Sequence, residues 1–170
     1  MTTDSNSSAG KWMYILAWIC VFGLITFALA ELLEQQFNPN RSPDSQRVNG
    51  IIEVKLEQNR AGHYVTSGTI NGKEVVFLVD TGATDVSIPA HLADYLGLIP
   101  GRKGYAQTAN GVVNIAETSI DSISIGDIRL VNVDANLNPG MQGNQILLGM
   151  SFLRQLEFTQ RGNALHLRTL

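Results

Sequence analysis

An apolar run without a single charged residue extends from Met13 to Ala30. A helix of that length rises roughly 27 Å, close to the thickness of the hydrocarbon core of a bilayer. Trp12 and Tyr14 lie where an interfacial aromatic belt is expected. A helix that is apolar on every face has no solvent side, which makes a core helix the weaker interpretation. The run predicts a transmembrane helix over residues 12–33, preceded by a disordered segment over residues 1–11.

A cleaved signal peptide is the alternative interpretation of the same segment. Lys11 supplies a short positive region, and Ala28-Leu29-Ala30 resembles a cleavage site flanked by small residues. Against cleavage, the run is longer than the apolar part of an ordinary signal peptide, and Leu32-Leu33 extend it. We therefore expect an uncleaved signal anchor. If Lys11 stays inside, the remainder of the chain lies across the membrane.

Charge and residue usage exclude several other classes of protein. The 170 residues suffice for one domain of ordinary size, and the net charge of -3 does not indicate a nucleic-acid-binding surface. Cys20 is the only cysteine, so neither an intrachain disulfide nor a cysteine-based metal site can form. The three histidines show no metal-ligand spacing: His63, His91 and His166. We expect no metal, no cofactor and no nucleic-acid partner.

The rest of the chain divides into a linker and a folded domain. Residues 34–49 contain Pro39 and Pro43 among polar neighbours. Such a segment favours extended chain and is unsuited to a core, so it predicts a linker. The folded domain is then expected over residues 50–170.

Short strands with glycine-containing turns dominate this domain. Apolar and charged residues alternate from Ile52 to Glu57, which predicts a half-buried strand. Asn71-Gly72, the strongest two-residue hairpin signal, separates Tyr64–Ile70 from Glu74–Val79. Similar turns are expected at Asn110-Gly111 and Gly126-Asp127, short helices at His91–Leu96 and Ser151–Glu157, and strands at Ile146–Leu148 and Ala164–Leu167. The pattern predicts a mainly β domain, a small barrel or sandwich with one or two short helices.

One acidic tripeptide stands at the end of a buried strand. Asp80-Thr81-Gly82 is followed by Ala83 and comes directly after the apolar residues Phe77 to Val79. Thr81 offers a hydroxyl, and Gly82 allows close approach of another chain or a ligand. By position alone, a strand-terminal Asx turn capped by Asp80 is the simpler interpretation.

Several features together resemble the retropepsins, the single-lobe aspartic peptidases of retroviruses and their bacterial relatives. These are Asp80-Thr81-Gly82-Ala83, a flap-like hairpin some 30 residues further on, and Ile146-Leu147-Leu148-Gly149 before a short helix. The likeness covers residues 50–170, and the apolar N-terminal run resembles the membrane-anchored bacterial members. It implies a small closed β-barrel-like acid protease fold with Asp80 as the catalytic carboxylate.

The resemblance also implies roles for neighbouring residues. Thr81 would bond across a dimer axis, Ala83 would belong to the active-site loop, and Gly149 would end the strand beneath it. Substrate would be bound by Gly82, Thr84, Asp85, Thr108, Ala109, Asn110 and Gly111, the last four at the flap tip. Viral members carry Asp where this chain has Thr84 and Arg where it has Met150, a pair of ions at the dimer interface. Loss of both together leaves no unpaired charge.

The chemistry of such a site requires two carboxylates that share one proton. This chain contains one Asp-Thr-Gly and no Asp-Ser-Gly. We therefore expect a homodimer, with Asp80 supplied by each copy. Gly50–Leu56 and Ala164–Leu167 are candidate edge strands of a shared interface sheet.

Substrate is expected as an extended peptide under the flaps. Cleft walls that include Val86, Ile88 and Val112 would favour hydrophobic residues around the cut. The resemblance implies a single-pass protein of the bacterial inner membrane, and Lys11 before the apolar run predicts that its catalytic domain lies on the periplasmic side. Two alternatives to an active endopeptidase remain open: a catalytically inactive dimerisation or peptide-binding module at the membrane, and an unrelated β domain in which the tripeptide occurs by chance.

Overall fold

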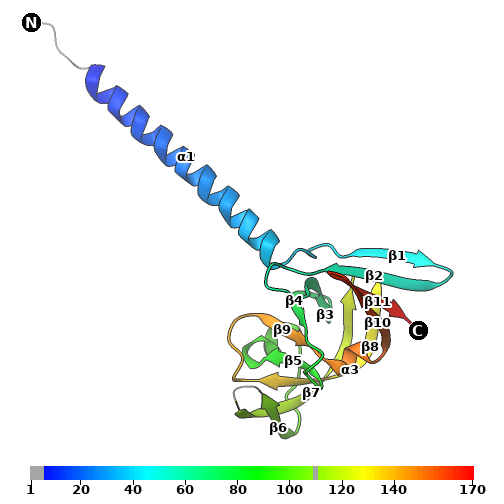
Figure 1. The fold of residues 1–170 in the computed structure, drawn as a ribbon. Coiled ribbons are helices and arrows are strands. Elements are labelled where there is room, and N and C mark those ends of the chain that lie inside the picture. The colour runs from blue at the N-terminus through cyan, green and yellow to red at the C-terminus, as the bar shows by residue number, and fades with distance from the viewer. Residues whose placement is uncertain (1–5, 109–110) are drawn as a thin grey trace, which may run out of the picture. The chain divides into compact units, whose positions relative to one another are not determined.

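The protein is described by a computed structural model that covers residues 6–108 and 111–170 (Figure 1). The chain divides into two compact units, Met1–Gln36 and Phe37–Leu170. The strands all lie in the second unit: β1 (Asp44–Val48), β2 (Ile51–Glu57), β3 (Val65–Ile70), β4 (Lys73–Val79), β5 (Val86–Pro89), β6 (Lys103–Thr108), β7 (Gly111–Ile125), β8 (Ile128–Asn138), β9 (Gln145–Leu148), β10 (Leu156–Arg161) and β11 (Ala164–Thr169). The same unit contains the short helices η1 (Ala90–Leu92), α2 (Ala93–Leu96) and α3 (Met150–Leu153).

The N-terminal helix, α1, extends from Asn6 to Phe37. It is longer at both ends than the expected span, because residues 6–11 and 34–37 are also helical. At its C-terminal end the glutamates and glutamines are good helix formers, and Gln35 Nε2 donates to Glu31 Oε1 one turn earlier at 3.3 Å. The helix stops before Pro39, whose ring disfavours helical geometry at the preceding residue. Its part from Gly10 to Phe37 is long and apolar enough to cross a membrane.

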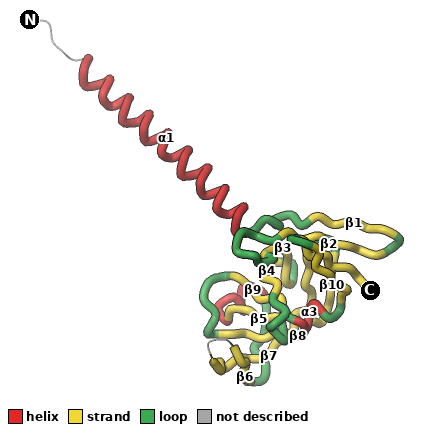
Figure 2. Tube along the Cα trace, in the orientation of Figure 1, coloured by secondary structure: helices red, strands yellow, loops and turns green. Residues whose placement is uncertain are grey.

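A seven-stranded sheet closes on itself to form a barrel-like domain (Figure 2). Its strand order is β3-β4-β9-β5-β8-β7-β6, and the additional pairing of β3 with β7 brings the two sides together. Large apolar side chains fill the interior without any exposure, among them Phe77, Ile88, Ile120, Ile146 and Phe152. The prediction of a mainly β, barrel-like fold with short helices is confirmed.

The turns follow the sequence signals, whereas one helix is shorter than expected. Asn71 and Gly72 both adopt positive φ, 50° and 76°, as the tight turn between β3 and β4 requires. Gly126 likewise turns β7 into β8 with a φ of 53°. The helix expected over Ser151–Glu157 ends at Leu153, and β10 begins at Leu156. The last residues of the predicted helix belong to β10 because they pair with β11.

The prediction of a linker over residues 34–49 is wrong. β1 pairs with β2 along its whole length, and the two strands are joined at Asn49 and Gly50, whose φ angles are 54° and 87°. Asn-Gly between two strands is the same hairpin signal that was recognised elsewhere in the chain. The two prolines led to the linker interpretation, but they lie outside β1. The folded domain therefore begins at Phe37 and not at residue 50.

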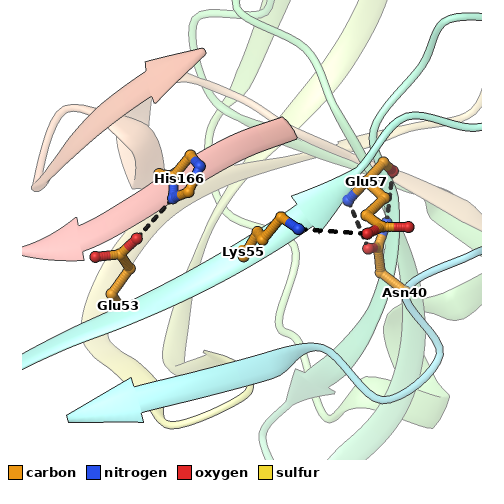
Figure 3. Close-up of polar contacts among 5 residues, drawn as sticks. All are labelled: Asn40, Glu53, Lys55, Glu57 and His166. Carbon is orange, nitrogen blue, oxygen red and sulfur yellow. Dashed lines mark hydrogen bonds and ion pairs between the residues drawn. The ribbon is translucent and has the colours of Figure 1, made fainter. Parts of the chain in front are cut away.

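Asn38 and Asn40 attach the start of this domain to its strands. Both are buried, although they are polar. Asn38 Nδ2 donates to Ser67 Oγ at 3.0 Å, and Asn40 Nδ2 donates to the carbonyls of Glu57 and Val65 at 2.9 and 2.7 Å. Glu57 N in turn donates to Asn40 Oδ1 at 2.7 Å (Figure 3). These bonds offset the cost of burying two carboxamides.

A second sheet contains the two ends of the domain in the order β1-β2-β11-β10. The prediction that Gly50–Leu56 and Ala164–Leu167 form edge strands is wrong, because β2 and β11 pair with each other at its centre. Across this pair His166 Nδ1 lies 2.6 Å from Glu53 Oε1 (Figure 3), and Arg168 Nε donates to Glu53 Oε2 at 2.7 Å. Hydrogen bonds from His166 and then Arg168 lower the pKa of the Glu53 carboxyl. All four strands of this sheet thus come from one chain, with β1 and β10 at its edges.

Candidate active site

Asp80 follows the last residue of β4, at the point where β4 lies parallel to β9. Its amide donates to the Leu148 carbonyl at 3.1 Å, which fixes the start of the loop to the neighbouring strand. Its Oδ1 accepts a hydrogen bond from Gly82 N at 2.9 Å, and the Ala83 amide donates to its carbonyl at 3.2 Å. The Asx turn considered from sequence is therefore present, and the half-buried Asp80 carboxylate also lines a cleft.

Gly149 and α3 support the active-site loop from behind. A Cβ at Gly149 would overlap the carbonyl groups of Asp85 and Ala83, so only glycine fits between β9 and the loop. The Met150 amide donates to the Ala83 carbonyl at 2.8 Å, and the Ser151 amide donates to the Thr84 carbonyl at 2.9 Å. The loop is thus held by backbone bonds where viral members are expected to use an ion pair.

Ser151 adds a buried hydroxyl to this support, a contribution that was not predicted from the sequence. It is almost fully buried, its Oγ accepts a bond from Val86 N at 2.9 Å, and it donates to the Asp134 carbonyl at 2.7 Å. One hydroxyl therefore ties α3 to β5 and β8. A serine just after the strand-ending glycine was the only available signal, and no local pattern separates it from an ordinary helix start.

The cleft beside Asp80 has a volume of about 660 Å³. Its lining contains five of the predicted site residues: Asp80, Gly82, Ala83, Thr84 and Asp85. From the flap hairpin, Tyr105, Ala106 and Gln107 line it, whereas Thr81 and Gly111 do not line it in the part of the chain that is described. Ala109 and Asn110 lie outside the described residues, and for Thr108 only the backbone is described, at the end of β6.

The three residues expected to form apolar walls lie elsewhere, although Ile115 and Leu147 do add apolar side chains to the cleft. Val86 and Ile88 point into the core with no exposure, and Val112 is 64% exposed on the flap hairpin outside the cleft. Successive residues of a strand face opposite sides of the sheet. The residues on the other face of these strands therefore line the cleft. The lining there is a polar wall, defined as Ser87, Asn136 and Asn138. None of these three residues was predicted from the sequence.

Asp85 lies at the end of the polar wall, and it also lines a neighbouring pocket. Burial, and then the negative charge of Asp134, raise the pKa of the Asp85 carboxyl, and the Arg154 guanidinium partly opposes this. Arg154 Nη2 lies 3.9 Å from Asp134 Oδ2. Among residues 6–108 and 111–170, no three His, Cys, Asp or Glu side chains gather into a possible metal-binding group.

Comparison with known proteins gives one family and several relatives. The family described as "gag-polyprotein putative aspartyl protease" matches residues 66–155. An uncharacterized Sinorhizobium protein from the cobV 5' region is 37% identical over 134 residues, which are 76% of this chain and 58% of that protein. An uncharacterized protein of Rickettsia prowazekii (strain Madrid E) is 26% identical over 165 residues, 92% of this chain and 71% of that protein. The chain thus spans less than two thirds of the Sinorhizobium relative.

A solved structure matches the fold as well. The crystal structure of a retropepsin-like aspartic protease from Rickettsia conorii superposes with a TM-score of 0.60 at 26% identity, over 74% of this chain and 94% of that one. The residues matched by the family include the loop that starts at Asp80 and the glycine that supports it, Gly149. The family match covers more than half of the sequence, so the chain belongs to the gag-polyprotein aspartyl protease family and has a retropepsin-like fold.

Proposed function

We propose that the chain is an aspartic endopeptidase that hydrolyses peptide bonds with a water activated between the Asp80 carboxylates of two identical copies. The observation that carries this proposal is the position of Asp80, at a strand end and in the lining of a cleft of about 660 Å³. Its loop is fixed from behind by backbone bonds to α3. A carboxylate held this way can meet its symmetry mate at a constant distance, which shared-proton chemistry needs.

The reaction uses one ionised and one protonated carboxyl group. The ionised Asp80 takes a proton from water while the water oxygen attacks the peptide carbonyl carbon. The protonated Asp80 of the second copy polarises the carbonyl oxygen. The Asp80 carboxyl that took the proton from water gives it to the peptide nitrogen as the C–N bond breaks, and the products are a carboxylic acid and an amine. The Gly82 carbonyl accepts a hydrogen bond from the substrate backbone near the bond that is cut.

The second copy supplies the second Asp80 carboxylate, and the contact between the two copies follows from the structure of this chain. Thr81 from each copy bonds across the two-fold axis. Within one chain β2 already pairs with β11, so a partner strand can join the four-stranded terminal sheet only at its outer strands, β1 or β10. The contact between copies then involves the active-site loops and the flaps, while the outer strands β1 and β10 remain open to a partner strand. Anchoring both copies in one membrane through residues 12–33 raises their effective concentration and offsets a small interface.

An extended protein or peptide segment is the substrate. It pairs its backbone with the flap hairpin as an added strand and passes over Asp80. Thr108, Ala109, Asn110 and Gly111 close over it, while Thr84 and Asp85 contact it from below. The proposed location is the bacterial inner membrane in a single pass, with the catalytic domain on the periplasmic side. That orientation is supported by Lys11 before the apolar helix.

Cleavage of a peptide library by the full chain in detergent micelles tests the proposal at about pH 4 to 6, where a shared-proton pair acts. Asp80→Asn should lower the rate by roughly 100- to 10,000-fold, because one member of the acid–base pair is lost from each copy. A peptide mimic with a central hydroxyl in place of the cut bond should inhibit. Asp121→Asn removes an exposed carboxylate outside the cleft and serves as the matched control. Cleavage that survives Asp80→Asn at the wild-type rate would exclude Asp80 as the catalytic residue.

A further inference from the structure

The polar wall arises from the register of two strands. β5 and β8 pair in parallel with Ser87 opposite Asn136 and Pro89 opposite Asn138. Residues opposite each other in a sheet point to the same face. Ser87 and Asn136 therefore face the cleft together, while their neighbours Val86 and Ile88 face the core. This placement is a property of the sheet, and the apolar residues Ile115 and Leu147 line the same cleft beside the polar wall.

The residues of this wall are buried and carry uncharged hydrogen-bonding groups. Ser87 is 7% exposed, and Asn136 and Asn138 are each 6% exposed. Ser87 Oγ lies 2.7 Å from Asn136 Oδ1, and Asn138 Oδ1 accepts a bond from Gly140 N at 2.8 Å. Within the described part of the chain, the Asn136 side chain bonds only with Ser87. Either orientation of its amide thus leaves one polar end for the cleft.

We propose that the polar wall is a specificity subsite for an uncharged substrate side chain that donates and accepts hydrogen bonds, a carboxamide or a hydroxyl. The proposal rests on the proposed function, because it names the substrate that the Asp80 cleft selects. An aliphatic side chain at this position would exclude water from the free amide end of Asn136 and return no hydrogen bond. A site built to hydrogen-bond its substrate discriminates strongly against an analogue that lacks the polar group.

The charges around the wall favour a neutral side chain over an ionised one. Asp85 stands at one end of the wall, and an acidic substrate side chain would be repelled by it. A basic side chain would lose its hydration in the subsite, and the uncharged groups of the wall would not compensate for that loss. The raised pKa of the Asp85 carboxyl weakens both its repulsion of an anion and its attraction of a cation at acidic pH, where the cost of giving up water disfavours either ion. The subsite is therefore selective for Asn, Gln, Ser or Thr side chains.

The experiment compares matched peptides that differ at one position near the cut, with Gln, Asn, Ser, Leu, Val, Glu or Lys there. For the wild-type full chain in micelles, kcat/KM should be about 5- to 100-fold higher with a carboxamide or hydroxyl than with Leu or Val, which corresponds to one buried hydrogen bond. The double variant Ser87→Val with Asn136→Leu removes both partners together. It should lose this preference by at least about tenfold and favour Leu or Val.

A matched control is provided by a second pair of hydroxyl side chains away from the cleft. Thr69 Oγ1 and Ser124 Oγ lie 2.7 Å apart between β3 and β7, and neither residue lines the cleft. Thr69→Val with Ser124→Ala also replaces a hydrogen-bonded polar pair by apolar groups. The substrate preference should be unchanged in this control. If the Ser87 and Asn136 double variant does not fold, Asn136→Asp replaces it, because its shape is nearly the same. It should move the preference toward Lys by about fivefold or more.

Peptide binding separates this inference from the proposed activity. The Asp80→Asn full chain keeps the polar wall, so it should bind the Gln or Asn peptides more tightly than the Leu peptide by a similar ratio. If the peptides with polar side chains bind more tightly but the wild type cleaves none of them, the proposed activity is wrong and the subsite is supported. Preference for Leu, Val, Glu or Lys by the wild type, an unchanged preference in the double variant, or no peptide binding at all would each overturn the subsite.

Discussion

The Asn40 side chain and the Glu57 backbone exchange two hydrogen bonds, from Asn40 Nδ2 to the Glu57 carbonyl at 2.9 Å and from Glu57 N to Asn40 Oδ1 at 2.7 Å. The carboxamide thus takes the place of a paired peptide group at the end of β2. It also bonds the Val65 carbonyl at the start of β3. The segment that follows the apolar helix is therefore part of the folded domain from its first residues.

Replacing this side chain tests how much the segment contributes to stability. Asn40→Ala leaves the Glu57 amide and two carbonyl groups without their partner in a buried place, so the free energy of unfolding should fall by about 3 kcal/mol. Urea unfolding of the full chain in micelles, followed by circular dichroism, measures the change. Asn163→Ala, at an exposed turn position, is the matched control and should change stability by less than about 0.5 kcal/mol. Equal losses in the two variants would contradict the role given to Asn40.

A methyl group at Gly149 should displace the active-site loop. In Gly149→Ala the new Cβ meets the Asp85 and Ala83 carbonyl groups, which are backbone atoms and cannot rotate away. We expect a loss of about 2 kcal/mol or more in stability together with loss of cleavage. Gly104→Ala is the comparison, because its Cβ would lie 3.7 Å from its nearest neighbours. A Gly149→Ala protein with wild-type stability and cleavage would show that the loop does not depend on this close packing.

The Glu53 carboxyl should make stability depend on acidity. Its pKa is lowered in the folded state by His166 and Arg168, below the ordinary value of 4.5. The group therefore stabilises the fold above the unfolded pKa, and this contribution is lost as pH falls through the folded pKa. Between pH of about 5 and 3, wild-type stability should fall more steeply than that of Glu53→Gln. Unfolding curves at several pH values measure both slopes. Parallel slopes would mean that the ion pair with His166 and Arg168 does not form in solution.

The requirement for two copies can be tested by mixing. With random assortment of equal amounts of wild-type and Asp80→Asn chains, about one quarter of the dimers carry two intact carboxylates. Activity should therefore fall to about half of that expected from the wild-type chains alone. If each chain works independently, the added variant has no effect. Wild-type and Asp121→Asn mixtures give the reference, since neither chain lacks the site residue.

Reconstitution tests the contribution of the membrane to the same dimer. In micelles, activity per chain should fall on dilution, because a dimer dissociates as the concentration of its chains falls. In vesicles at a fixed ratio of protein to lipid, activity per chain should stay constant when the suspension is diluted, since both copies remain in one membrane. The rate per chain is measured over a hundredfold range of concentration. Constant activity per chain in micelles over that range would show that a shared membrane is not needed for assembly.

Local signals in the sequence determined much of the fold and the central residue of the site. The uncharged run from Met13 to Ala30 predicted a helix, Asn71-Gly72 predicted the turn between β3 and β4, and alternation predicted β2. Each is a property of neighbouring residues: hydrophobicity, turn geometry or strand period. The tripeptide at Asp80 was recognised because it is contiguous and follows an apolar strand.

Only the tertiary structure decided which distant segments meet. Asn40 is buried because two carbonyls and an amide from β2 and β3 surround it, and nothing within the segment signals those partners. The pairing of β2 with β11 was missed for the same reason, as was the position of Ser87 opposite Asn136 in the cleft. Pairing and register between strands far apart in sequence depend on how the whole barrel closes. They therefore determine which side of a strand lines the site, a choice that local sequence leaves open.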